Sequence, residues 1–305
     1  MTYAELANMM AKPEELKKTE EYLAAELSRF LRPRDRLLIC LPFASEDSIG
    51  ALLERAALRM GAVPIVWKND LRWKALLKLA FDSRADAIAG SPQTILGLTK
   101  LAKFTRTPLN FRYVLTSGYP CMDWIDQGIR RGLDCESVGA LGIGFGPVVA
   151  GFACKVNDGV HLREDYFDVK ILDDNGDAVP NGEMGYIVLS PKEHPELQFR
   201  PGDRGRLDVS ACSCGCKSPR LTDLDFFEGV DMSLVKLAGD LLTWSSVLDC
   251  SIKRGECGLE LEMVVFPGEK LPKLPTVARQ RIRPWDPDTD VPYLRVPGWN
   301  VPNSG

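Results

Sequence analysis

The chain has 305 residues, of which 45% are hydrophobic and 26% charged, the profile of a soluble globular protein with one large or two modest domains. The formal net charge of −4 gives no indication of a nucleic-acid or membrane partner, and no segment approaches the ~20 apolar residues that span a bilayer. The N-terminal stretch lacks the short apolar run of a signal peptide. Nine cysteines, an odd number, favour a reducing compartment over a disulfide framework, so we expect a cytoplasmic protein.

The first part of the chain alternates between helical and strand patterns. Residues 13–31 have apolar positions at helical spacing, with Pro13 suited to a first turn and Pro33 after the end. The run RLLICLPF (36–43) is continuously apolar, as in a strand covered on both faces. The pattern then predicts helices at 47–60, 71–82, 92–103 and 121–131, and strands at 62–67, 85–90, 111–117 and 137–145. This alternation predicts an α/β domain over residues 1–150, a parallel sheet flanked by helices.

Beyond residue 150 the pattern changes to short strands and turns. The sequence DDNGD (173–177) is a hairpin signal, because Asn-Gly tolerates positive φ. We predict a β subdomain over residues 151–225 and a third unit, 226–305, of short strands followed by a proline-rich tail. From about residue 270 the tail is expected to lie extended over the surface or to be partly disordered.

Four residues of the β subdomain have the chemistry of a metal site: Cys154, His161, Cys212 and Cys214. One imidazole with three thiolates is a standard ligand set for zinc. The alternative is that the cysteines fill the core as small hydrophobes, which we expect for Cys40, Cys135, Cys250 and Cys257. Cys212 and Cys214 instead lie in a stretch rich in Gly, Ser and Pro. There Cys216 is a spare that could replace either of them as a ligand.

The segments around these residues resemble the adenylate-forming acyl-CoA synthetase superfamily, most closely its phenylacetate–coenzyme A ligase branch. The block at 154–190 is similar to that branch's Cys, Gly-x-His, Glu-Asp and Gly-Glu-x-Gly-Glu pattern. RPGD (200–203) resembles the family's Arg-Thr-Gly-Asp, and CSCGCKSPR (212–220) its Cys-x-Cys-Gly-Arg loop, which in this branch completes a structural zinc site. AGSPQTILGL (89–98) resembles the family's Thr-Pro-Ser helix start, and TSGYP (116–120) resembles its Gly-Gly-Glu-Pro turn. The resemblance covers residues 1–250 and implies a trimmed version of the family's large domain, with a zinc-closed β subdomain.

The family makes an acyl adenylate from a carboxylate and ATP and passes the acyl group to a thiol, usually coenzyme A. The chain departs from the residues that this chemistry requires. It starts too late to include the phosphate loop, and Tyr119 stands where the family has a Glu. The Thr-Glu that holds Mg²⁺ corresponds to Val148 and Val149, or to Ile143 and Gly144 in an ungapped alignment. No Asp or Glu occurs between Ser137 and Asn157.

Two residues of the family's nucleotide site remain in register. The resemblance implies that Asp203 binds ribose, with Arg200 beside it, although Pro-Gly-Asp is also an ordinary turn sequence. We therefore expect a degenerate acyl-CoA ligase-like protein that does not adenylate a carboxylate by itself and binds an adenosine-containing ligand, such as AMP or coenzyme A, or an acyl intermediate. If it is active, the reaction is that of an acid–thiol ligase or acyl transferase, with a protein partner supplying the missing parts. The alternative is a non-catalytic scaffold or partner subunit that keeps the fold and a structural zinc.

Overall fold

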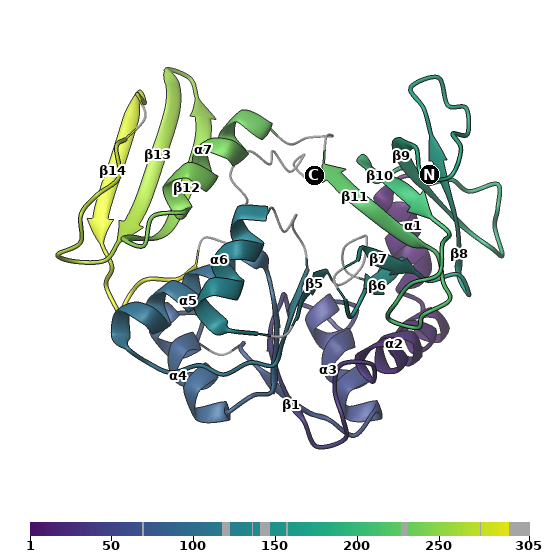
Figure 1. Ribbon diagram of the computed structural model, residues 1–305, viewed down its shortest axis with the longest axis horizontal. Coiled ribbons are helices and arrows are strands. Elements are labelled where there is room, and N and C mark those ends of the chain that lie inside the picture. The colour runs from purple at the N-terminus through teal and green to yellow at the C-terminus, as the bar shows by residue number, and fades with distance from the viewer. Residues whose placement is uncertain are drawn as a thin grey trace.

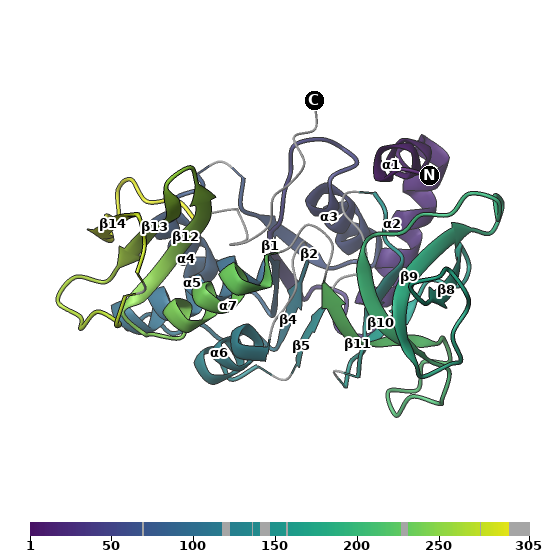
Figure 2. The ribbon, with the colours of Figure 1, turned by 90° about the horizontal axis from the view of Figure 1, so that it is seen from above.

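The computed structural model describes residues 1–68, 70–117, 123–135, 137–140, 147–156, 158–226, 231–274 and 276–292. These residues form three β-sheets (Figures 1 and 2). A central parallel sheet carries most of the helices, and the two other sheets lie on opposite flanks of it. Among the helices of these residues, none is both long and apolar enough to cross a membrane.

The parallel sheet confirms the predicted α/β pattern. Its strands stand in the order β2-β1-β3-β4-β5, and every neighbouring pair is parallel. They are β1 (Arg36–Cys40), β2 (Val63–Val66), β3 (Ala87–Gly90), β4 (Tyr113–Thr116) and β5 (Ser137–Ala140). The helices between and before them are α2 (Pro13–Leu27), α3 (Ile49–Arg59), α4 (Trp73–Ser83), α5 (Pro92–Thr105) and α6 (Asp123–Leu133). Pro13 begins α2 and Pro92 begins α5, because a missing N–H costs nothing in a first helical turn.

Successive residues of β1 face opposite sides of the sheet, and both sides are apolar because helices cover both. Leu37 and Ile39 belong to a core cluster with α2 and α3. Leu38 and Cys40 belong to the other cluster, with α4, α5 and α6. This two-sided burial explains why the sequence of the strand is continuously hydrophobic.

The second sheet is antiparallel, in the order β6-β7-β11-β10-β9-β8. Its strands are β6 (Gly151–Ala153), β7 (Val160–Leu162), β8 (Phe167–Leu172), β9 (Met184–Pro191), β10 (Asp203–Asp208) and β11 (Arg220–Phe226). The predicted turn at 173–177 follows β8. The Asp173 carboxylate accepts the N–H groups of Asn175 and Asp177, and Gly176 takes a φ of 88°. The N-terminal helix α1 (Tyr3–Met10), which was not predicted, packs on this sheet through Leu6 and Met10.

The C-terminal part differs from the prediction of short strands followed by a surface tail. Residues 232–242 form the helix α7 (Met232–Leu242), whose N-cap is Asp231. The strands β12 (Val247–Gly255) and β13 (Gly258–Val265) form an antiparallel pair. Within the region assigned to the tail, β14 (Arg279–Pro284) pairs in parallel with β13, so it is part of a sheet and not surface coil. Residues 293–305 lie outside the described residues.

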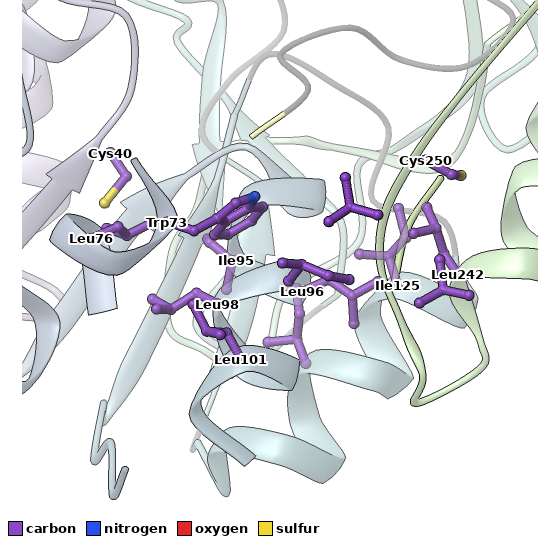
Figure 3. Close-up of a cluster of buried hydrophobic side chains, with 14 of the residues drawn as sticks. Cys40, Trp73, Leu76, Ile95, Leu96, Leu98, Leu101, Ile125, Leu242 and Cys250 are labelled. Carbon is purple, nitrogen blue, oxygen red and sulfur yellow. The ribbon is translucent and has the colours of Figure 1, made fainter. Parts of the chain in front are cut away.

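This C-terminal sheet shares its core with the parallel sheet. Figure 3 shows Leu242 of α7 close to Ile125 of α6, which lies next to Leu96 of α5, and Cys250 of β12 belongs to the same cluster. The same cluster continues through Trp73 of α4 to β1. Burying this apolar surface is favourable, so β12–β14 are held against α4–α6 by the hydrophobic effect. The division of the chain into three units at residues 150 and 225 stays a prediction.

Candidate metal centre

The four residues predicted as metal ligands come from three places in the antiparallel sheet. Cys154 follows β6, His161 is the middle residue of β7, and Cys212 and Cys214 lie in the connection between β10 and β11. Their ligand atoms all lie within 4.8 Å of one another, a group that could hold a metal ion. Cys154, His161 and Cys212 are buried, and Cys214 is half-buried.

A tight turn brings Cys154 to His161. The Cys154 N–H donates to the carbonyl of Gly159, which has a φ of +78°. A Cβ at Gly159 would lie 2.3 Å from the carbonyl oxygen of Leu221 in β11. Glycine is therefore required here both for the backbone conformation and for the approach of the turn to the neighbouring strand.

The cluster has nearly the dimensions of a zinc site. The sulfur atoms of Cys154 and Cys212 are 3.4 Å apart, and Nε2 of His161 is 3.2 Å from Sγ of Cys214. A tetrahedron with Zn–S bonds of about 2.3 Å has edges of about 3.8 Å. These two pairs thus differ from the edges of such a tetrahedron by only a few tenths of an ångström, and all four ligand atoms lie within 4.8 Å of one another.

The ring of His161 is held in the orientation that a metal ligand needs. Its Nδ1 is 2.9 Å from the carbonyl oxygen of Ser218, so Nδ1 carries the proton and donates it. Nε2 is then unprotonated and faces the sulfur atoms. A backbone carbonyl on the far nitrogen is the usual way in which proteins orient a metal-binding histidine.

Hydrogen bonds favour the thiolate form at Cys212. Burial opposes its ionisation, but hydrogen bonds from the backbone N–H of Cys214 and from neighbouring side chains outweigh burial and lower the pKa of Cys212 to about 6. At Cys154, burial dominates and raises the pKa of the thiol to about 11. One thiol is therefore poised to lose its proton ahead of the other, and metal ligation requires the loss from all three.

Two arginines border the cluster, and neither was predicted from the sequence. Arg220 is 2% exposed, stands opposite His161 in the β7–β11 ladder, and pairs with Asp208 and Asp158. The Nη2 of Arg29, which follows α2, donates to the sulfur of Cys214 at 3.1 Å. Arg220 could have been noted from its place in the CSCGCKSPR segment. Arg29 precedes Cys214 by 185 residues, and nothing in its own segment marks it.

The other cysteines that the structure describes lie outside the cluster. Cys216 is outside the group of four, and its backbone N–H donates to the sulfur of Cys214 at 3.4 Å. Cys40 and Cys250 are buried, as core cysteines should be. Cys135 is half-buried, and Cys257 is exposed in the turn between β12 and β13, so the prediction of core burial is wrong for Cys257.

Arg200 and Asp203 lie at the far end of the β10–β11 hairpin from the metal loop. Asp203 is the first residue of β10 and is paired in register with Phe226, the last residue of β11. Arg200 is exposed, and its guanidinium carbon lies 3.5 Å from the centroid of the Tyr186 ring on β9. At about 3.4 Å per residue, the length of β10 separates Asp203 from the loop that carries Cys212 and Cys214. The two predicted sites are therefore separate in the structure.

Val148 and Val149, which the resemblance aligns with the family's Mg²⁺ residues, occupy apolar core positions. Val148 is 1% exposed in the cluster under the antiparallel sheet, and Val149 is 4% exposed in the cluster of α2 and α3. The alternative pair, Ile143 and Gly144, and the aligned Tyr119 lie outside the described residues.

The chain has the fold of adenylate-forming acyl-CoA ligases, although no family model and no curated protein matches its sequence. A structure of 2-hydroxyisobutyryl-CoA ligase in the postadenylation state with R3-HIB-AMP matches with a TM-score of 0.68 and 14% identity, over 95% of this chain and 69% of that one. An open conformation of the ligase with 2-HIB-AMP and CoA matches with a TM-score of 0.61 and 18% identity, over 83% of this chain and 60% of that one. The anthranilate-CoA ligase AuaEII with anthranoyl-AMP matches with a TM-score of 0.54 and 13% identity, over 87% of this chain and 60% of that one. The chain thus spans 60–69% of the length of these enzymes.

Proposed function

We propose that this chain is a degenerate member of the adenylate-forming acyl-CoA ligase family, close to the phenylacetate–coenzyme A ligase branch. It binds an adenosine-containing ligand or an acyl intermediate and does not adenylate a carboxylate by itself. The family assignment is supported by the shared fold together with the order of the sequence motifs. The loss of adenylation is supported by one observation above all, the burial of Val148 and Val149 in the hydrophobic core.

The valines matter because adenylation depends on Mg²⁺. The ion neutralises the phosphates of ATP and takes oxygen ligands, of which a carboxylate is the main protein contribution. The two valine side chains offer no oxygen ligand and pack among apolar groups. A single lost electrostatic contact in a catalytic site costs about 3–4 kcal/mol of barrier, so loss of the metal carboxylate is expected to slow the reaction by at least about 10²- to 10³-fold.

Ligand binding is proposed for the segment around Asp203. The 2-hydroxyisobutyryl-CoA ligase structures contain an acyl-AMP, and one also contains CoA, so the fold accommodates both kinds of adenosine compound. We assign Asp203 to the ribose hydroxyls and Arg200 to the neighbouring part of the ligand. Hydrogen bonds to a carboxylate are among the stronger ones, worth about 1.5–3 kcal/mol.

We further propose that the cluster of Cys154, His161, Cys212 and Cys214 holds a structural zinc ion. All four tetrahedral positions are then filled by protein atoms, which leaves no open position for a substrate or water. The ion joins β6, β7 and the β10–β11 connection, so its role is to close the antiparallel sheet. The binding energy of such an ion contributes directly to folding.

Isothermal titration calorimetry of the purified chain tests the binding proposal. AMP and coenzyme A should bind more tightly than ATP, because the ~4 negative charges of the triphosphate lack a Mg²⁺ carboxylate here. Asp203→Ala should weaken AMP binding by about 10- to 100-fold, in line with ~1.5–3 kcal/mol for its hydrogen bonds. Asp168→Ala, an exposed carboxylate on β8, is the matched control and should bind as the wild type does. No heat with millimolar AMP or coenzyme A would reject the ligand and leave the non-catalytic scaffold as the function.

A further inference from the structure

The end of helix α2 contacts the candidate metal centre directly. Arg29 lies two residues beyond Leu27, the last residue of α2, and uses both of its terminal nitrogens. Nη2 donates to Sγ of Cys214 at 3.1 Å, and Nη1 donates to a carboxylate oxygen of Glu26 at 2.7 Å. The side chains of Arg29 and Glu26 are only 21% and 17% exposed. Glu26 therefore holds the planar guanidinium in the orientation in which it meets the sulfur.

Among the three cysteine ligands, Cys214 is the one whose thiolate a positively charged partner is expected to stabilise and shield the most. Three thiolates and one dication leave an excess of one negative charge on the centre. Cys154 and Cys212 are buried, whereas Cys214 is half-buried and is the more accessible to water and to competing chelators. A guanidinium donating to its sulfur stabilises the thiolate and covers it from one side.

Helix α2 is itself anchored to both sheets. Leu23 and Leu27 pack in the core of the parallel sheet. Thr19 accepts a hydrogen bond, 3.0 Å long, from the buried Arg163, which follows β7 of the antiparallel sheet. The hydrogen bond from Arg29 to Cys214 adds a further contact between α2 and the antiparallel sheet, at the loop that carries the candidate ligands. The Arg29 side chain thus connects the end of α2 directly to the metal centre.

We propose that Arg29 is a positioning residue of the metal centre, which fixes the Cys214 thiolate and makes retention of the metal and docking of the end of α2 depend on each other. This inference rests on the zinc centre proposed above. It assigns a role to a residue that is remote in sequence from every ligand, and it gives the metal an effect on the junction between the two sheets.

The first test is the rate of zinc transfer from the full chain to an excess of a chromophoric chelator. Arg29→Met should release zinc about 10- to 100-fold faster than the wild type, the usual effect of losing a partner of a metal ligand. Arg29→Lys keeps the charge but not the planar guanidinium, so its rate of zinc release should lie between those of the wild type and Arg29→Met. Glu26→Gln should accelerate release less than Arg29→Met. Arg32→Met, an exposed arginine three residues later, is the matched control and should match the wild type.

Hydrogen exchange at residues 28–31 gives a second, structural readout. Removing zinc from the wild type should speed exchange in this segment, and in Arg29→Met the zinc-loaded protein should already exchange faster. Should Arg29→Met fail to fold, Arg29→Lys and Glu26→Gln carry both measurements. A wild-type chain that purifies without zinc would overturn the metal centre and this inference together. Zinc present in the wild type, with release from Arg29→Met no faster than from Arg32→Met, would overturn the role of Arg29 alone.

Discussion

Lys100 of α5 donates a hydrogen bond to the main-chain carbonyl of Val247, 2.7 Å away and 147 residues later in the chain. The same ammonium group also donates to the carbonyl of Leu242, the last residue of α7. One cation therefore satisfies a carbonyl at the end of α7 and another at the start of β12. Positive charge is favourable at the C-terminus of a helix, where the last carbonyls lack partners within the helix. Leu242 and Val247 both belong to the hydrophobic cluster that joins the C-terminal sheet to α4–α6.

Replacing Lys100 by Met should destabilise the protein. The carbonyls of Leu242 and Val247 would lose their donor, and an unsatisfied buried polar group costs about 1–3 kcal/mol. Urea unfolding at neutral pH should therefore show a lower free energy of unfolding for Lys100→Met. Lys103→Met, which removes an exposed lysine from the same helix, should change it little. Equal loss in the two variants would show that the contact has no special role.

The stability contributed through Lys100 should depend on pH. Desolvation lowers its pKa from the usual 10.5 to about 8 in the folded protein. The folded state then binds fewer protons than the unfolded state between these values, so the free energy of unfolding rises with pH there. Measured at pH 7.5 and at pH 9.5, the difference in stability between wild type and Lys100→Met should grow in favour of the wild type. A difference that shrinks as the pH rises would contradict the assignment.

The metal proposal predicts a clear distinction between neighbouring cysteines. Cys212→Ser and His161→Ala should lose the ~1 equivalent of zinc expected in the wild type and should unfold at lower temperature, because structural zinc contributes folding energy. Cys216→Ser should keep its zinc, because Cys216 lies outside the cluster. Elemental analysis and thermal unfolding of the three variants measure both effects. Loss of zinc from Cys216→Ser with retention in Cys212→Ser would mean that the ligand set is wrong.

Replacing a glycine of α5 by alanine should destabilise the protein, although this substitution normally stabilises a helix. Alanine normally favours a helix over glycine by up to ~1 kcal/mol. At Gly97, however, an added Cβ would lie 2.2 Å from Cη2 of the buried Trp73. Gly97→Ala should therefore lower the free energy of unfolding, by about 1–3 kcal/mol as in other overpacked cores. At Gly128 of α6 the nearest atom is the terminal methyl of Leu96, which can move, so Gly128→Ala should cost less. Chemical unfolding of both variants makes the comparison.

The parallel sheet could be predicted from the sequence because its signals are local. Each strand is a short apolar run, as in β1, and each helix has its own periodicity and often a proline at its start. The same kind of signal was present in α7 but was missed. Asp231 caps the helix by accepting the N–H groups of Ser233 and Leu234, and the buried positions that follow have helical spacing. The error lay in expecting strands throughout that region.

Other features depend on pairing between distant segments and could not be predicted. The strand β14 is recognisable only through its partner β13, because its own sequence, RQRIRP, is polar. The four candidate ligands were predicted from residue type and from the resemblance, and the fold brings them together. The contact of Arg29 with Cys214 could not be predicted, because a single arginine after an amphipathic helix has the sequence pattern of an ordinary surface residue. The assignment of Asp203 to a nucleotide ligand stays a prediction.

The most direct test of the proposed function is ATP–pyrophosphate exchange with the purified chain, Mg²⁺ and a panel of aryl and fatty acids. We predict no exchange above a control without protein, because Val148 and Val149 occupy the aligned positions of the Mg²⁺ residues and are buried in apolar clusters. The same preparation should bind AMP by calorimetry, which shows that it is folded and competent for ligand. Carboxylate-dependent exchange by the single chain would contradict the account and restore a complete adenylating enzyme.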